Sequence, residues 1–171
     1  DCCQRGFHEP VAAYRAVHID IRQKLFKQIH EALGGDIRLF ISGAAGIDPQ
    51  VAKGFREIGF NLVQGYGLTE CAPIVALNRD VNYKDDAAGL PLPNLQVEIH
   101  EPDEDGIGEI KCKGSSVMLG YYENPEATGK VIRDGWFYTG DLGFIDREGF
   151  VHITGRKKNV IITGNGKNVF P

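Results

Sequence analysis

The sequence contains no apolar run long enough to cross a membrane. A membrane-spanning helix needs roughly 18 or more apolar residues in succession, whereas the longest apolar stretches here, such as Val160-Ile161-Ile162, are the size of a short strand. The opening residues, Asp1-Cys2-Cys3-Gln4-Arg5, are not followed by the apolar segment of a secretory signal peptide. The hydrophobic and charged fractions, 42% and 25%, are ordinary for a globular protein. We therefore expect a globular protein without a transmembrane segment.

An excess of positive charge is also missing. The formal net charge at pH 7 is -4, and the one basic cluster is Arg156-Lys157-Lys158. Proteins that bind a nucleic acid duplex neutralise several phosphates at once, and this cluster is too small for that. The sequence therefore predicts no nucleic-acid partner.

Cysteine is scarce, and its placement excludes the common cysteine sites. The four cysteines are Cys2, Cys3, Cys71 and Cys112, and no two of them have the spacing of zinc ligands. Adjacent cysteines such as Cys2 and Cys3 rarely bridge each other. This pattern favours a reduced, cytoplasmic protein.

Two features of the sequence favour an incomplete polypeptide. The only methionine is Met118, so there is no initiator residue. The last residues, Asn168-Val169-Phe170-Pro171, come directly after an apolar hairpin pattern. We therefore expect a piece of a longer chain.

The first part of the sequence predicts a βαβ unit preceded by a helix. Residues 20–33 have the pattern of an amphipathic helix that ends at Gly34-Gly35, and residues 37–42 follow as a short buried strand. Asp48-Pro49 begins a second helix, because Asp suits the N-cap and Pro the first turn. Residues 60–63 form the next strand, which we expect to be parallel to the first. The inner faces of the two helices are expected to carry Ile21, Leu25, Phe26, Ile29, Leu33, Val51, Ala52, Phe55 and Ile58.

After Cys71 the pattern changes to that of an antiparallel sheet. Apolar and polar residues alternate over residues 95–99 and 110–112, with glycines and acidic turns between them. Asn124-Pro125 begins one short helix. Two hairpins are expected, one with strands 142–146 and 150–154 and the other with strands 159–163 and 167–170. The segment between the hairpins is a natural domain boundary.

Two loops leave the carboxyl ends of the expected parallel strands, where open α/β sheets bind their ligands. The first, Ser42-Gly43-Ala44-Ala45-Gly46, has small side chains, so a flat group can lie against its backbone. The second offers an aromatic ring in Tyr66, a hydroxyl in Thr69 and a carboxylate in Glu70. These groups suit a base, a phosphate and a divalent cation. Each loop taken alone is also compatible with an ordinary glycine-rich turn.

Asp141 is a third candidate. It follows Gly140 in the segment Trp136-Phe137-Tyr138-Thr139-Gly140-Asp141. A carboxylate in this position can accept two hydrogen bonds from a cis-diol such as ribose. Taken alone, Asp141 is also compatible with a turn residue at the start of a strand.

Three motifs taken together resemble the adenylate-forming superfamily, which includes acyl-CoA synthetases, peptide-synthetase adenylation domains and luciferases. They are, in order, Tyr66-Gly67-Leu68-Thr69-Glu70, Tyr138-Thr139-Gly140-Asp141 and Gly155-Arg156-Lys157-Lys158-Asn159. Gly108-Glu109-Ile110 and Gly120-Tyr121-Tyr122 are similar to the intermediate motifs of the superfamily. Several motifs in the right order are far more specific than any one of them.

Two longer stretches resemble long-chain fatty acyl-CoA ligases in particular. They are residues 62–73 (LVQGYGLTECAP) and residues 155–171 (GRKKNVIITGNGKNVFP). The resemblance covers nearly the whole chain beyond residue 20. It implies that a carboxylate and ATP form acyl-AMP and pyrophosphate, and that CoA then takes the acyl group as a thioester.

The resemblance also implies where the parts of ATP lie. Adenine is expected between the Tyr66-Gly67 segment and the Gly43-Ala44-Ala45 backbone, with Ile153 closing its edge. The superfamily pattern places Asp141 on the ribose hydroxyls, assisted by Arg156. It gives catalytic roles to Thr69 at the α-phosphate, to Glu70 as the Mg²⁺ ligand and to Lys158 at a hinge between the half-reactions. Gly164-Asn165-Gly166 is expected to approach the pantetheine arm of CoA.

Several expected parts are missing from these residues. The Ser/Thr/Gly-rich phosphate loop and the adenylation lysine of the superfamily are not found in the sequence. We therefore expect the 171 residues alone to be inactive. Cys71 stands where Thr or Ser is frequent, and we interpret it as a packing residue. His152 lies in mid-strand and is interpreted as structural.

The sequence as a whole predicts an α/β fold, described more closely as an α+β fragment. Its parts are the βαβ edge of a parent sheet, a distorted antiparallel barrel-like subdomain and a terminal hairpin. Residues 1–154 are assigned to the C-terminal portion of an AMP-binding domain, and residues 155–171 to the hinge and first hairpin of a small C-terminal domain.

The predicted parent is an ATP-dependent long-chain fatty acid–CoA ligase. The alternatives are an aryl or short-chain acid–CoA ligase and a non-catalytic nucleotide-binding module of the same ancestry. The apolar terminal hairpin is expected to pack against a second copy of the chain and form a homodimer, because a lone hairpin is marginal in water. Its alternative is to fold back on its own barrel.

Overall fold

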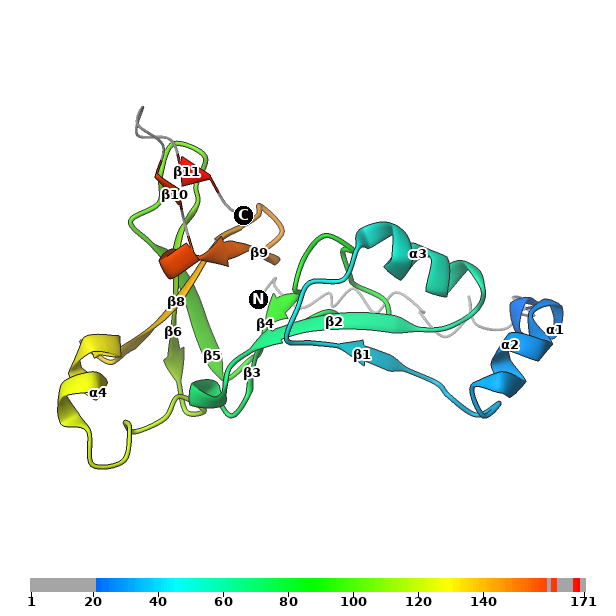
Figure 1. Cartoon of the computed structure of the whole chain (residues 1–171), viewed down its shortest axis with the longest axis horizontal. Coiled ribbons are helices and arrows are strands. Elements are labelled where there is room, and N and C mark those ends of the chain that lie inside the picture. Colours follow the sequence, from blue (N-terminus) through cyan, green and yellow to red (C-terminus); the bar gives the residue numbers. More distant parts are fainter. Residues whose placement is uncertain (1–20, 160, 163–167, 170–171) are drawn as a thin grey trace, which may run out of the picture.

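Two β-sheets form the body of the chain, with α1 and α2 at one end of the molecule and α4 at the other (Figure 1). The computed structural model describes residues 21–159, 161–162 and 168–169. The first sheet has the strand order β1-β2-β3-β4, and the second has the order β5-β6-β8-β7 with β9 also paired to β8. Within the described residues, no helix is long and apolar enough to cross a membrane.

The first sheet contains the expected βαβ unit. Strand β1 pairs in parallel with β2, with Ile41 opposite Val63. Between them, Asp48 Oδ1 caps α3 by accepting a hydrogen bond of 2.7 Å from Gln50 N. On its other side β2 pairs antiparallel with β3, which in turn pairs with β4. The elements of this part are β1 (Phe40–Ser42), α3 (Pro49–Glu57), β2 (Leu62–Gly67), η2 (Thr69–Cys71), β3 (Ile74–Leu77) and β4 (Leu90–Pro91).

The second sheet is antiparallel and curls into half of a barrel, as predicted. Strand β5 pairs with β6 over its whole length, from Leu95 opposite Gly114 to His100 opposite Glu109. The hairpin of β8 and β9 was also predicted. The elements of this part are β5 (Leu95–His100), β6 (Gly108–Gly114), α4 (Pro125–Val131), β7 (Ile132–Arg133), β8 (Trp136–Ile145), β9 (Val151–Arg156) and η3 (Lys157–Asn159).

The strands of the predicted terminal hairpin are paired in the structure. Strand β10 (Ile161–Ile162) pairs antiparallel with β11 (Asn168–Val169). The predicted turn at Gly164-Asn165-Gly166, like Cys2 and Cys3, lies outside the described residues.

The two sheets share one core region. Val75 and Ala76 of β3 are fully buried, and they belong to two apolar clusters formed with the second sheet. One cluster includes Cys112 and Phe137, and the other includes Ile110 and Val151. Each large apolar side chain buried in this way stabilises the fold by about 1.5–3 kcal/mol. The junction of the sheets is therefore well fixed, and the cavity described below lies there.

The predicted helix over residues 20–33 is wrong in two respects. The helix is broken at Phe26 into α1 (Arg22–Leu25) and α2 (Lys27–Ala32). Its apolar stripe is exposed, with Leu25 72% accessible. The docked residue is instead His30, which stacks on Phe60 at 4.0 Å and whose Nε2 contacts Ile58 O at 2.9 Å.

The prediction of a buried first strand over residues 37–42 is also wrong. Strand β1 is shorter, and Ile41 is 62% exposed while Ile37 and Leu39 are exposed before it. Helix α3 covers only one face of β1, where Phe40 meets Phe55 at 5.7 Å. Strand β2 begins later than the predicted residues 60–63 and continues to Gly67, because its end pairs with β3.

Candidate functional site

A cavity of about 590 Å³ lies at the carboxyl ends of β1 and β2. This volume is in the range of small-molecule sites. The cavity brings together most of the residues that the sequence predicts for adenine and ribose, although they come from three separate stretches of the chain. Those that line it are Ala44, Ala45, Tyr66, Gly67, Asp141, Ile153 and Arg156.

Asp141 is a buried carboxylate of the cavity that two side chains hold in place. It lies on β8 and is only 4% exposed. Its Oδ2 accepts a hydrogen bond of 2.8 Å from the Tyr66 hydroxyl, and its Oδ1 accepts one of 2.9 Å from Arg156 Nε. The Arg156 side chain is 70% exposed, so its charge stands at the mouth of the cavity. The carboxylate is thus held in one orientation and keeps lone pairs for a ligand.

The Tyr66 hydroxyl stays protonated in this setting. Burial, together with the neighbouring Asp141 carboxylate, raises the pKa of Tyr66 well above its usual range. A protonated hydroxyl can donate to Asp141 at any ordinary pH. The ring of Tyr66 therefore presents a fixed apolar surface to the cavity.

Gly67 lets the chain leave β2 sharply. A Cβ at this position would lie 1.9 Å from Pro73 O, and the same carbonyl accepts a hydrogen bond of 2.7 Å from Leu68 N. The register of β2 and β3 shifts between Tyr66 and Gly67. Only glycine fits there, and the close turn directs the following segment, Thr69 and Glu70, away from the sheet.

Four predicted site residues do not line the cavity: Gly43, Thr69, Glu70 and Lys158. Thr69 and Glu70 lie in the short helix η2 beyond the cavity, where Glu70 Oε1 accepts a hydrogen bond of 2.9 Å from the Tyr121 hydroxyl. Lys158 lies on the exposed face of η3. The described residues contain no group of three or more His, Cys, Asp or Glu side chains placed to hold a metal ion.

The first residue of η3, Lys157, is tied to the second sheet by a buried carboxylate. Glu109, with an 8% exposed side chain, accepts a hydrogen bond of 2.9 Å from Lys157 Nζ through Oε2. Its Oε1 accepts one of 3.1 Å from Gly140 N. The predicted hinge therefore begins at a point that is anchored beside Asp141.

Sequence reasoning missed one whole wall of the cavity. Asp85, Asp86 and Ala88, in the loop between β3 and β4, line it together with Gln64. Asp85 is paired with Arg56. The acidic pair after Lys84 was the available signal in the sequence, but nothing in a linear pattern brings this loop to the ends of β1 and β2.

Gln64 connects two walls of the cavity. Its Oε1 accepts a hydrogen bond of 3.2 Å from Ile47 N in the loop after β1. Its Nε2 donates to Ala87 O at 2.7 Å and to Asp85 O at 3.3 Å in the other loop. The carboxamide uses its acceptor and both donor positions, so no charged residue of the same shape can replace it.

The interpretation of Cys71 as a packing residue is confirmed. Cys71 and Cys112 are both fully buried, with their Sγ atoms 3.3 Å apart. The hydrogen bond with Cys112 and burial raise the pKa of the Cys71 thiol far above its usual value. Such a thiol is a poor nucleophile.

Comparison with known proteins decides the family. A sequence model described as AMP-binding enzyme matches residues 10–122. The chain belongs to the AMP-binding enzyme family. It is 37% identical to the long-chain-fatty-acid–CoA ligase FadD15 of Mycobacterium bovis over 171 residues. This alignment covers 100% of this chain and 27% of that protein. It is 39% identical over 143 residues to the long-chain-fatty-acid–CoA ligase of Bacillus subtilis, covering 79% of this chain and 25% of that one.

Solved structures of the family agree with the fold. The O-succinylbenzoate CoA synthetase of Bacillus subtilis in complex with AMP matches with a TM-score of 0.73 and 31% identity, over 87% of this chain and 33% of that chain. Apo MatB of Rhodopseudomonas palustris matches with a TM-score of 0.72 and 35% identity, over 88% and 32%. This chain thus spans only about a quarter to a third of the length of these family members.

Proposed function

We propose that the chain supplies the adenosine-binding part of an ATP-dependent acid–CoA ligase. The observation that carries this proposal is Asp141, a buried carboxylate held by Tyr66 and Arg156 inside the cavity. Ribose hydroxyls can donate to such a carboxylate, and adenine can lie on the Tyr66 ring against the backbone of Ala44 and Ala45. Ile153 then closes the edge of the base.

The charges of the cavity support a base and ribose here rather than a triphosphate. Among the described residues, its lining includes four carboxylates, those of Asp48, Asp85, Asp86 and Asp141, and one cationic side chain, that of Arg156. Phosphates would be repelled by this lining. We infer that they leave the cavity toward Thr69 and Glu70, which follow Gly67 along the chain.

Glu70 fits the role of a magnesium ligand. Mg²⁺ is usually bound by one or two carboxylates together with substrate phosphates and water. Glu70 offers one half-exposed carboxylate, of which Oε1 is oriented by Tyr121. When bound, Mg²⁺ would supply positive charge to the phosphates, and Thr69 would donate its hydroxyl to the α-phosphate.

The long-chain substrate class is a finer proposal. Its support is the resemblance of residues 62–73 and 155–171 to long-chain ligases and the names of the relatives FadD15 and its Bacillus counterpart. An aryl acid is the alternative, since structures named as an O-succinylbenzoate synthetase and an anthranilate CoA ligase also match. In the longer polypeptide we expect faster turnover of acids of ten or more carbons than of benzoate or acetate. A preference for benzoate would favour the alternative.

The remaining roles concern the second half-reaction. We propose that residues 1–154 belong to the large AMP-binding domain and residues 155–171 to the small one, with Lys158 at the hinge and Gly164-Asn165-Gly166 near CoA. The Lys157 contact to Glu109 supports a hinge that begins directly after the ribose site. The two unbridged thiols of Cys71 and Cys112 support a reduced, cytoplasmic setting.

Nucleotide titration of the 171-residue chain tests the adenosine site. We expect AMP to bind with a dissociation constant on the order of millimolar, observed by NMR or calorimetry. Asp141→Ala should abolish binding. Glu126→Ala is the matched control, since it removes an exposed carboxylate of α4 whose side chain is 82% accessible. Equal AMP binding by Asp141→Ala and Glu126→Ala would refute the site.

A further inference from the structure

The loop that forms the missed wall of the cavity is held by its carbonyl oxygens. Asn78 Nδ2 donates to Lys84 O at 3.0 Å and to Ala87 O at 2.8 Å, and Gln64 Nε2 holds the carbonyls of Asp85 and Ala87. His152 Nδ1 contacts Asp86 O at 3.1 Å. Residues 84–87 have no strand pairing, and the backbone of the wall meets a strand only at its end, where Ala88 N donates to Val151 O at 2.8 Å. Side chains from elsewhere therefore hold most of the wall.

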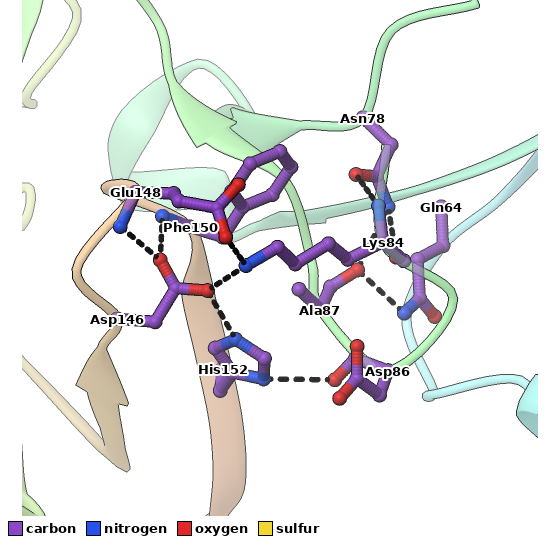
Figure 2. Close-up of polar contacts among 9 residues, drawn as sticks. All are labelled: Gln64, Asn78, Lys84, Asp86, Ala87, Asp146, Glu148, Phe150 and His152. Carbon is purple, nitrogen blue, oxygen red and sulfur yellow. Dashed lines mark hydrogen bonds and ion pairs between the residues drawn. The ribbon is translucent and has the colours of Figure 1, made fainter. Parts of the chain in front are cut away.

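Asp146 lies next to this loop, and its two carboxylate oxygens contact different sets of groups. Oδ1 accepts hydrogen bonds of 2.9 Å from Glu148 N and from Phe150 N, which close the turn between β8 and β9. Oδ2 accepts 2.6 Å from Lys84 Nζ and lies 3.2 Å from His152 Nε2. Figure 2 shows both side chains converging on this one oxygen.

The contacts of Oδ2 lie in a partly buried environment. The side chains of Lys84, Asp146 and His152 are 28%, 18% and 11% exposed. The His152 ring stacks on Phe144 at 4.4 Å, and both of its nitrogens face oxygen atoms, those of Asp86 O and Asp146 Oδ2. Glu148, which also binds Lys84, is 69% exposed and lies at the rim.

We propose that Asp146 is a positioning residue for the cavity, which through Lys84 and His152 fixes the wall formed by Asp85, Asp86 and Ala88. The proposal rests on the proposed adenosine site only for the statement that the wall faces a nucleotide. Lys84 begins the wall segment, and His152 holds the carbonyl of Asp86 within it. Loss of Oδ2 as an acceptor removes the Asp146 contact from both side chains at once and leaves Lys84 only the exposed Glu148 carboxylate.

Asp146→Asn separates the two functions of the side chain. The Asn carbonyl oxygen can still accept the Glu148 and Phe150 amides, because Asn forms the same type of turn. Its NH2 group then faces the Lys84 ammonium, so a donor meets a donor, and the carboxylate oxygen beside His152 Nε2 is lost. The turn is expected to persist while the attachment of the loop is lost.

The chain contains a matched control. Asp103 closes the turn between β5 and β6 in the same way, since its Oδ1 accepts hydrogen bonds from Asp105 N at 3.0 Å and Ile107 N at 2.8 Å. That turn is exposed and does not line the cavity. Asp103→Asn therefore makes the same chemical change in the same kind of turn at a distance from the wall.

Amide hydrogen exchange of the 171-residue chain measures directly how firmly the wall residues are held. The amides of Lys84, Ala87 and Ala88 are bound to Asn78 Oδ1, Lys84 O and Val151 O. In Asp146→Asn we expect their exchange to accelerate about tenfold or more, with unchanged protection of the Phe150 amide and a changed ¹⁵N resonance of His152 Nε2. Asp103→Asn should leave all of these signals as in the wild type.

AMP titration of the same variants then links the wall to the ligand. We expect affinity to fall several-fold in Asp146→Asn and to be unchanged in Asp103→Asn. Lys84→Met keeps an unbranched apolar side chain but removes the ammonium that lies over the Phe150 ring and binds Asp146. It should loosen the same amides, and it is the second test variant if Asp146→Asn does not fold. Unchanged exchange in both wall variants, or an AMP affinity unaffected by a loosened wall, would overturn the proposal.

Absence of AMP binding in the wild type would refute the adenosine site instead, and exchange alone would then decide whether Asp146 positions the wall.

Discussion

The Tyr66 hydroxyl donates to the Asp141 carboxylate at 2.8 Å although the two residues are 75 positions apart in the sequence. The bond connects β2 of the first sheet to β8 of the second. The two groups expected to bind adenine and ribose are therefore fixed relative to each other before any ligand is present. Such preorganisation lowers the entropic cost of binding.

Tyr66→Phe should separate stability from adenine stacking. The variant keeps the ring but leaves Asp141 Oδ2 buried without this donor, so we expect the free energy of unfolding in urea to fall by about 1–3 kcal/mol. AMP affinity should fall less than in Asp141→Ala, because the ring face remains. An unfolding free energy equal to that of the wild type would contradict the hydrogen bond.

Acid should reduce the stabilising effect of Asp146. Desolvation raises the pKa of this carboxyl, but hydrogen bonds from Lys84, from the Phe150 and Glu148 amides and from His152 lower it well below its usual range. A group with a depressed pKa stabilises the fold above the unfolded-state pKa, about 4 for Asp, and this stabilisation is lost as the pH falls below it. The difference in unfolding free energy between wild type and Asp146→Asn should therefore narrow below about pH 4. A difference that is constant from pH 6 to about pH 2.5 would contradict the shift.

The 171-residue chain alone should not activate fatty acids. It contains neither the phosphate loop nor the adenylation lysine that the superfamily pattern requires, and the loss of a positioned charge opposite a reacting group costs roughly 2.7–4 kcal/mol of the barrier. Palmitate-dependent exchange of pyrophosphate into ATP should remain at background. Exchange at a rate comparable to that of a full-length ligase would show that these elements are dispensable.

The terminal hairpin should mediate self-association. Strands β10 and β11 pair with each other, and a two-stranded hairpin needs further packing to be stable in water. Static light scattering should give a dimer for the 171-residue chain and a monomer for a version that ends at Thr154. Monomers in both samples would favour the alternative that the tail folds back on its own barrel.

Local signals in the sequence were sufficient for much of the fold. Asp48-Pro49 located α3, and the strand–helix–strand spacing gave the parallel pairing of β1 and β2. Alternation over residues 95–99 and 110–112 predicted the antiparallel sheet. These features depend on near neighbours, for which propensity and capping are informative.

The failures depend on contacts that a linear pattern does not contain. The apolar stripe of residues 21–33 predicted a buried face, but stacking of His30 on Phe60 determines which face docks. The motif residues of the cavity were located because a family pattern names them, whereas Asp85, Asp86 and Ala88 belong to no motif. Their position follows from Gln64, Asn78 and His152, three side chains that meet the loop only after the sheets have formed.

The attachment of this loop through main-chain oxygens has a consequence for how such a pocket changes during evolution. The loop is held through backbone carbonyl groups, which every amino acid possesses, by the side chains of Gln64, Asn78 and His152. These hydrogen bonds therefore do not depend on which residue occupies position 86. Asp86 is exposed and lines the cavity. Substitutions at this position can therefore alter the surface that faces a ligand without changing the backbone conformation of the loop.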